Sequence, residues 1–182
     1  MKSSRAEHGP AAPDVDEPAP VPRGGYRSGI PPDLREPVGI RPIPAADTAT
    51  LRGEVLRPGQ PPDRRVYAGD DDPRTLHLGA FDAGEVVGIA SLYREDRADG
   101  PAGGWRLRGM ATSPAHRGRG AGRALLDACV DHAAAQEGSE LWCNARMVAV
   151  EFYRRAGFAA VGEQFDIPGI GGHVVMRRTL QR

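Results

Sequence analysis

A run of glycine and arginine, Arg117-Gly118-Arg119-Gly120-Ala121-Gly122-Arg123, has the composition of an anion-binding loop. Glycine lacks a Cβ, so its backbone N–H groups can converge on one ligand, and the run stands at the start of an expected helix whose first N–H groups have no internal partner. The helix N-terminus adds about half a positive charge, and each arginine adds a full one. The pattern predicts a pyrophosphate site. A glycine turn beside a solvated basic patch is the alternative.

Two common phosphate-binding loops do not fit this run. The P-loop requires Gly-Lys followed by Ser or Thr, and the chain has no lysine other than Lys2. The dinucleotide-binding fingerprint Gly-x-Gly-x-x-Gly requires Gly or Ala at the position that Arg123 occupies. The spacing that remains is Arg-x-x-Gly-x-Gly, from Arg117 to Gly122.

The run joins an expected strand to the strongest helical pattern of the chain. The strand covers Trp105 to Thr112 and ends at a Ser-Pro turn. From Gly120 to Gln136, apolar residues such as Leu125 and Cys129 recur at steps of three and four. This period predicts a helix with one face on the core.

Shorter patterns predict the other elements. A first helix is expected to begin at Asp47 as its cap, and a later one covers Val148 to Ala156. Asp82-Ala83-Gly84 predicts a tight turn between two strands. The remaining strands are expected at Val38–Ile43, Leu76–Phe81, Val86–Leu92, Leu141–Ala145, Phe158–Val161 and His173–Thr179. The order β-α-β-β-β-α-β-α-β-β predicts an α/β (α+β) fold, a mixed sheet with helices on its faces.

A second motif follows the loop, after one expected helix and one expected strand. The segment Glu151-Phe152-Tyr153-Arg154-Arg155-Ala156-Gly157-Phe158 contains Phe-Tyr-x-x-x-Gly-Phe at the end of the last expected helix. Together with the Arg-x-x-Gly-x-Gly loop, it resembles the GNAT N-acetyltransferase superfamily. The resemblance covers about Val38 to Leu180 and is specific from Trp105 to Phe158. It implies a mostly antiparallel sheet whose central strands, Trp105–Thr112 and Leu141–Ala145, splay to admit the pantetheine arm of acetyl-CoA.

The resemblance also implies which residues hold acetyl-CoA. Backbone groups of the strand before the loop would pair with the arm, and amides from Gly118 to Arg123 would bind the pyrophosphate. Asn144, the only asparagine, would hydrogen-bond the arm or the substrate, or else a neighbouring turn. The implied cofactor-binding residues are Met110, Ala111, Thr112, Arg117, Gly118, Arg119, Gly120, Ala121, Gly122, Arg123, Asn144 and Tyr153.

Tyr153 is the implied catalytic residue. A phenol near the sulfur can protonate the CoA thiolate that leaves when an amine attacks the thioester. The alternative is an aromatic side chain that only packs, which is the expectation for Phe152 and Phe158.

The sequence offers several alternatives for the general base that takes the proton from the amine. Family members often carry a glutamate on the strand before the loop, but this strand carries arginines and no carboxylate or histidine. His77, Glu95, Asp96 and His173 are alternatives, and so is a chain of waters.

Three segments away from the loop are similar to those of bacterial GNAT proteins of the ElaA type. They are Val55 to Gln60, Leu76 to Phe81 and Gly169 to Met176. This similarity implies that Arg57, His77 and His173 line the acceptor pocket.

Composition limits the partners. Lys+Arg and Asp+Glu both number 24 in the 182 residues, so the net charge of zero favours neither nucleic acid nor a membrane surface. The two cysteines, Cys129 and Cys143, match no metal-ligand spacing and predict no metal, buried thiols and a reduced, cytoplasmic setting. No apolar run reaches the roughly 18 residues that cross a bilayer.

Two regions are expected. Residues 1–37 are rich in proline and poor in large apolar groups, which predicts a disordered tail, and residues 38–182 form the acetyltransferase-like domain. The predicted activity is transfer of an acetyl group from acetyl-CoA to a primary amine of a small molecule or peptide, by direct attack in a ternary complex. A weakly catalytic acetyl-CoA-binding regulatory module is the alternative, and a homodimer is left open.

Overall fold

One mixed sheet forms the centre of the described region. The computed structural model describes residues 38–181, and the predicted tail lies outside them. The seven strands lie in the order β1-β2-β3-β4-β5-β7-β6. Their bounds are β1 Gly39–Pro42, β2 Leu76–Asp82, β3 Glu85–Arg94, β4 Trp105–Thr112, β5 Glu140–Arg146, β6 Ala159–Ile167 and β7 Gly171–Thr179. All neighbouring strands are antiparallel except β4 and β5, which confirms the predicted mixed, mostly antiparallel sheet.

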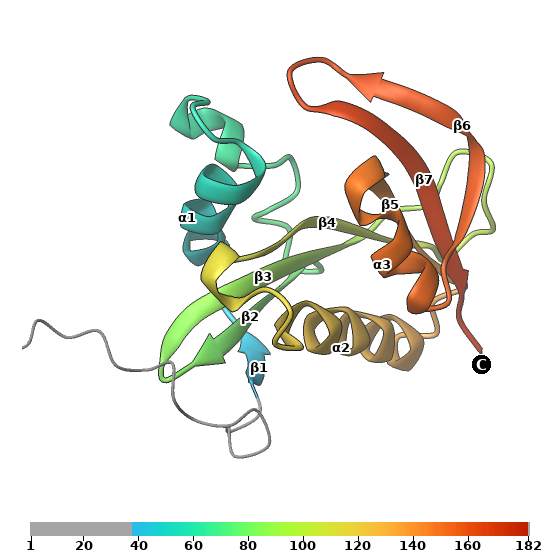
Figure 1. The fold of residues 1–182 in the computed structure, drawn as a ribbon. Coiled ribbons are helices and arrows are strands. Elements are labelled where there is room, and N and C mark those ends of the chain that lie inside the picture. The colour runs from blue at the N-terminus through green and yellow to red at the C-terminus, as the bar shows by residue number, and fades with distance from the viewer. Residues whose placement is uncertain (1–37, 182) are drawn as a thin grey trace, which may run out of the picture. The chain divides into compact units, whose positions relative to one another are not determined.

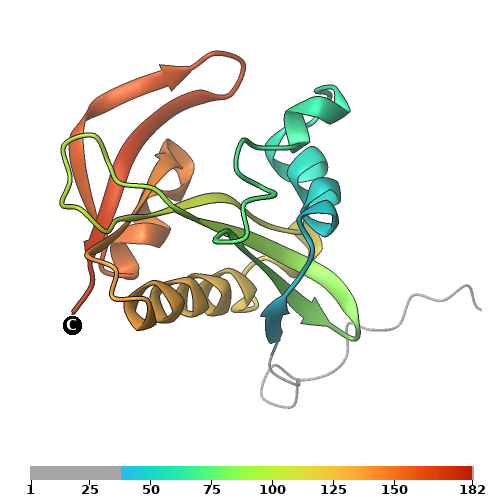
Figure 2. The ribbon, with the colours of Figure 1, turned by 180° about the vertical axis from the view of Figure 1, so that it is seen from behind.

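Helices cover both faces of this sheet. Figures 1 and 2 show the segment around α1 on one face and α2 on the other. The helical elements are η2 Ala45–Thr48, α1 Ala49–Leu51, η3 Arg52–Leu56, η4 Pro62–Arg65, η5 Pro114–His116, α2 Ala121–Ala135, η6 Met147–Ala149 and α3 Val150–Arg155. Among them, no helix has both the length and the apolar character needed to cross a bilayer.

Two apolar clusters correspond to the two faces. The larger one includes Leu125 and Leu126 of α2 with Ala90 and Leu92 of β3. The smaller one joins Leu51 of α1 to neighbouring strands, among them Ile89 of β3, packed against Val55 and Leu56 of η3. Strand β3 is therefore buried on both faces, as its continuous apolar sequence predicts for a central strand.

The first hairpin turns as the sequence predicts. Ala83 and Gly84 separate β2 from β3, and their φ angles are 50° and 87°. Positive φ at both central residues is the mark of a type I′ turn, whose twist matches that of the flanking strands.

Two expected element boundaries were wrong. The first helical segment begins at Ala45 after Pro44, so Asp47 lies in its first turn and does not cap it. Strand β6 continues to Ile167, well beyond Val161, because it pairs with β7 on both sides of an irregularity between Val161 and Phe165. The residues within that irregularity are polar or glycine, so they lack the β-branched pattern that indicates a strand.

Strands β4 and β5 pair only at their beginnings. The paired residues are Trp105 with Leu141 and Arg106 with Trp142, after which no ladder joins the two strands within residues 38–181. Strand β4 also has a bulge. Arg108 lies opposite Ser91 and Ala111 opposite Ile89, so β4 has one more residue than β3 between these pairs. Gly109 lies within this bulge with a φ of 60°. Bulges of this kind bend a strand and redirect its backbone groups.

Candidate active site

A cleft of about 670 Å³ opens where β4 and β5 part. Residues 106–112 of β4 form one side, and residues 143–146 of β5 with α3 form the other. Residues 55–57 at the end of η3 and Ile167 and Ile170 near the β6–β7 turn complete the lining. Figure 1 shows the segment around α1 and the β6–β7 hairpin on two sides of β4.

The free edge of β4 faces this cleft. Met110, Ala111 and Thr112 all line it, and they lie beyond the last residue of β4 that pairs with β5. Backbone N–H and C=O groups at such an edge can pair with an extended ligand, as they would with an added strand.

The glycine-rich loop borders the cleft through Arg117 and Gly122. Gly118 and Gly120 have φ angles of 72° and 87°, and a Cβ built on either would meet nothing within 4 Å. No side chain caps α2, so the N–H groups of its first turn stay open to a ligand. Of the predicted loop residues, Arg117 and Gly122 line the cleft, whereas Gly118, Arg119, Gly120, Ala121 and Arg123 do not.

Arg123 differs from the other arginines of the loop. Its Nε donates to Asp127 Oδ2 at 2.8 Å, and this hydrogen bond raises the pKa of Arg123. Arg117 and Arg119 form no ion pair with any carboxylate of residues 38–181.

Tyr153 reaches from α3 across the cleft toward β4. Its side chain is buried, and its hydroxyl donates to Met110 Sδ at 3.7 Å. The rings of Phe152 and Phe158 contact it edge-on, with centroid distances of 5.2 and 5.4 Å. Burial, and then the neighbouring Cys143 thiol, raise the pKa of Tyr153 well above its usual value. The hydroxyl therefore keeps its proton at neutral pH.

His173 of β7 and Asn144 of β5 also line the cleft. His173 is buried, and its Nδ1 lies 2.7 Å from the carbonyl oxygen of Gly171. Because a carbonyl only accepts, this contact fixes the proton of the neutral ring on Nδ1, and in that form Nε2 has a free lone pair. The ring stacks on Phe165 with a centroid distance of 6.0 Å.

The other predicted base candidates lie away from this lining. His77 hydrogen-bonds through both ring nitrogens, with Ser91 Oγ at 2.8 Å and the Asp70 carbonyl oxygen at 3.0 Å. Glu95 pairs with Arg106 at 2.6 Å, and Asp96 accepts the Gly104 N–H at 2.6 Å. Of the predicted acceptor-pocket residues, the cleft brings Arg57 and His173 together and does not include His77.

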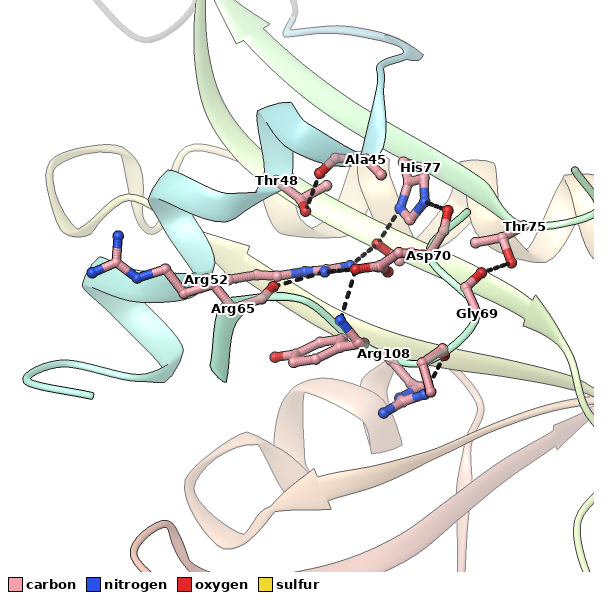
Figure 3. A network of polar contacts seen from close by, with 12 residues as sticks. Ala45, Thr48, Arg52, Arg65, Gly69, Asp70, Thr75, His77 and Arg108 are labelled. Atoms are coloured by element: carbon pink, nitrogen blue, oxygen red, sulfur yellow. Dashed lines mark hydrogen bonds and ion pairs between the residues drawn. The ribbon is translucent and has the colours of Figure 1, made fainter. Parts of the chain in front are cut away.

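Sequence reasoning missed a buried ion pair behind the cleft. The guanidinium of Arg52 contacts the carboxylate of Asp70 with Nη1–Oδ2 and Nη2–Oδ1 distances of 2.5 and 3.0 Å (Figure 3). Nη2 also donates to Ser91 Oγ at 2.9 Å, and the Tyr93 hydroxyl donates to Asp70. Arg52 is fully buried. Apolar periodicity around Leu51 places Arg52 on a helix, but no local pattern connects it with Asp70.

Both members of this pair are charged. Burial alone raises the pKa of Asp70, but hydrogen bonds from Arg52, the Tyr67 N–H and Tyr93 outweigh it, and the net pKa is lowered. Burial likewise lowers the pKa of Arg52, but its contacts with Asp70 and Tyr93 leave it raised.

The side chain of Arg52 lies close to the β4 bulge. A Cβ on Gly109 would lie 3.0 Å from Arg52 Nε and 3.1 Å from the ring of Tyr67. Tyr67 lines the cleft, and its ring contacts two cations, with Arg52 Cζ 4.1 Å and Arg108 Cζ 4.9 Å from its centroid. A glycine inside an expected strand is the one signal that could have indicated this bulge.

Comparison with known proteins agrees with the fold. The family model described as an acetyltransferase (GNAT) domain matches residues 46–180. YitI of Bacillus subtilis (strain 168), named an uncharacterized N-acetyltransferase, is 38% identical over 144 residues, which cover 78% of this chain and 96% of YitI.

Two solved structures share the fold. Escherichia coli ElaA has a TM-score of 0.64 at 18% identity, covering 78% of this chain and 99% of that chain. An aminoglycoside 6'-N-acetyltransferase complexed with coenzyme A has a TM-score of 0.61 at 14% identity, covering 79% of this chain and 97% of that chain. The family match spans most of the chain, so this protein belongs to the GNAT family and is an acetyl-CoA-dependent acetyltransferase.

Proposed function

We propose that the chain transfers an acetyl group from acetyl-CoA directly to a primary amine of a small molecule or peptide, both bound at once in the cleft. The observation that carries the proposal is the meeting of three features in this cleft: the free β4 edge, the glycine-rich loop and the Tyr153 hydroxyl. Direct attack needs both reactants in one site, and the cleft of about 670 Å³ can hold the reacting parts of both.

The loop and the β4 edge would hold acetyl-CoA. Open backbone amides from Gly118 to Arg123, with the charge of Arg117, suit the pyrophosphate. Backbone groups from Met110 to Thr112 would pair with the pantetheine arm, and Asn144 would hydrogen-bond it from the β5 side. Acetyl-CoA supplies the thioester whose carbonyl carbon the amine attacks.

Two side chains would handle the protons. Tyr153 would donate its hydroxyl proton to the sulfur as the carbon–sulfur bond breaks, because it stays protonated at neutral pH and lies beside the free part of β4. His173 Nε2 would accept the proton that the amine loses, directly or through a water. The products are an amide and free CoA thiol.

The proposal uses no metal ion. Within residues 38–181, no group of three or more His, Cys, Asp or Glu side chains could hold one. A cytoplasmic setting is part of the same proposal and is supported by two cysteines, Cys129 and Cys143, that are both free and buried.

The test is release of CoA thiol from acetyl-CoA in the presence of a panel of primary amines, with the acetylated amine identified by mass spectrometry. The expected result is thiol release that depends on at least one amine and yields an equal amount of amide. Tight acetyl-CoA binding without thiol release for any amine would favour the regulatory alternative and overturn the proposal.

A further inference from the structure

The charged side chains that line the cleft are all basic. Its lining includes Arg57, Arg106, Arg108, Arg117 and Arg146 and, among the described residues, no Asp or Glu. Arg106 is neutralised by Glu95, with Nη1 2.6 Å from Oε1. The other four form no ion pair with a carboxylate between residues 38 and 181. A simple amine is a cation before it reacts, so it gains nothing from such a lining.

Arg57 and Arg146 come together from two sides of the cleft. Arg57 follows η3, and Arg146 ends β5. Nη2 of Arg146 donates to the carbonyl oxygen of Leu56 at 2.5 Å, which brings its guanidinium beside Arg57. Nε of Arg57 is buried and has no hydrogen-bond partner within the described part of the chain.

No carboxylate of residues 38–181 pairs with either guanidinium to offset their mutual repulsion. Burial lowers the pKa of Arg146 and the positive charge of Arg57 lowers it further, whereas Tyr67 acts in the opposite direction, and the net pKa is lowered. Two guanidinium groups held close together, with a buried donor unused, are stabilised most by an anion that accepts hydrogen bonds from both.

The other two unpaired arginines have different surroundings. Arg117 belongs to the glycine-rich loop at the phosphate end. Arg108 donates to the carbonyl oxygen of Ala68 at 3.3 Å and stacks on Tyr67 and Tyr93. Its guanidinium is therefore directed toward the segment that carries Tyr67 and Ala68 (Figure 3). Arg146 lies opposite His173 in the pairing of β5 with β7, and Arg57 lines the same cleft. Arg57 and Arg146 are therefore the cations available to the acceptor.

We propose that Arg57 and Arg146 bind a carboxylate on the acceptor, so that the substrate is an amine that also carries a carboxylate, such as an amino acid. This inference rests on the proposed function, because it concerns the acceptor end of the same cleft. Guanidinium groups present paired donors that match the two oxygens of a carboxylate. Their charge also favours the neutral form of a nearby amine, which is the form that attacks a thioester.

Matched acids and amides test this inference on the full chain. Leucine, phenylalanine and β-alanine, each with its own carboxamide, are titrated into the CoA-loaded protein by calorimetry, and the same compounds are assayed for thiol release from acetyl-CoA. At least one acid is expected to bind about tenfold or more tightly than its amide, the value of one charge-assisted contact. Arg57→Gln and Arg146→Gln should each remove this preference.

Two controls separate the acceptor site from the cofactor site and from general charge effects. Arg64→Gln changes an exposed arginine of η4 outside the cleft lining and should leave the preference intact. The affinity of both cleft variants for acetyl-CoA should stay within about twofold of the unmodified chain, which also shows that they fold.

The outcomes are distinct. Equal affinity for every acid and its amide, or a preference that survives both substitutions, overturns the inference. Loss of acetyl-CoA affinity in the folded variants assigns these arginines to a CoA phosphate and also overturns it. A preference for acids without thiol release overturns the proposed function and supports the carboxylate site.

Discussion

Tyr153 allows proton transfer to be separated from packing. Tyr153→Phe removes the hydroxyl and keeps the ring contacts with Phe152 and Phe158. If the hydroxyl protonates the departing thiolate, kcat should fall by about 10²-fold while the Kd for acetyl-CoA stays nearly unchanged. Steady-state kinetics at saturating acetyl-CoA and a thermal melt measure the two effects. An unchanged kcat would leave Tyr153 as a packing residue.

The Arg52–Asp70 pair contributes to stability in a pH-dependent way. The pKa of Asp70 is lower in the folded chain than in the unfolded one, where it is about 3.9. Its contribution to the free energy of unfolding is therefore complete above that value and is lost as the pH falls through the folded pKa. Asp70→Asn should flatten this acid dependence in urea titrations.

Removal of the cationic partner should cost much of the stability that the pair provides. Arg52→Met leaves Asp70 buried without its counter-ion and should lower the free energy of unfolding by about 3–5 kcal/mol at pH 7. A loss below about 1 kcal/mol, the range of an exposed pair, would show that water reaches Asp70 in solution.

The β4 bulge should be sensitive to a single methyl group. Gly109→Ala forces a side chain into a positive φ and against Arg52 and Tyr67, so both stability and kcat should fall. Gly84→Ala is the matched control, because Gly84 also has a positive φ but its Cβ would meet nothing within 4 Å. The control should cost about 1 kcal/mol of stability and leave kcat unchanged. Equal kcat values for the two variants would show that the bulge does not contribute to catalysis.

The start of α2 can be tested by charge alone. Gly120→Asn and Gly120→Asp have the same shape, and both residues tolerate the left-handed φ of 87° at this position. A Cβ at this position would meet nothing within 4 Å, so neither substitution should unfold the helix. The aspartate should weaken acetyl-CoA binding by about tenfold or more relative to the asparagine, because it repels the pyrophosphate. Calorimetry compares the two Kd values, and equal values would exclude the loop as the phosphate site.

Elements that depend on local patterns could be predicted, and contacts between distant segments could not. Periodicity predicted β4 from Trp105 to Thr112 and α2 within one residue at each end. The ion pair of Arg52 with Asp70 and the bond from Arg146 to Leu56 join segments whose approach depends on the assembled sheet. The glycine-rich loop could be predicted because all its residues are consecutive, whereas the acceptor end is assembled from η3, β5 and β7.

At the scale of the whole molecule, the sequence predicts a domain boundary between residues 37 and 38. Deletion of residues 1–37 should change the free energy of unfolding by less than about 1 kcal/mol, because this segment is proline-rich and poor in large apolar groups. The family match begins at residue 46, and β1 begins at Gly39, so the deletion keeps the β1–β2 pairing. Chemical denaturation with the acetyl-CoA Kd as a second readout measures the effect.

A slightly longer deletion gives the matched control for this boundary. Removing residues 1–43 also removes β1 and Ile43, which packs against the smaller apolar cluster. It further removes Arg41, whose guanidinium lies 3.7 Å from the ring centroid of Phe81. This deletion should destabilise the domain by about 2 kcal/mol or more. Full burial of a large aliphatic side chain contributes about 1.5–3 kcal/mol, Ile40 and Ile43 are both partly buried, and the strand pairing adds to their contribution. If the shorter deletion costs as much as the longer one, residues 1–37 stabilise the domain and the boundary at residue 38 is wrong.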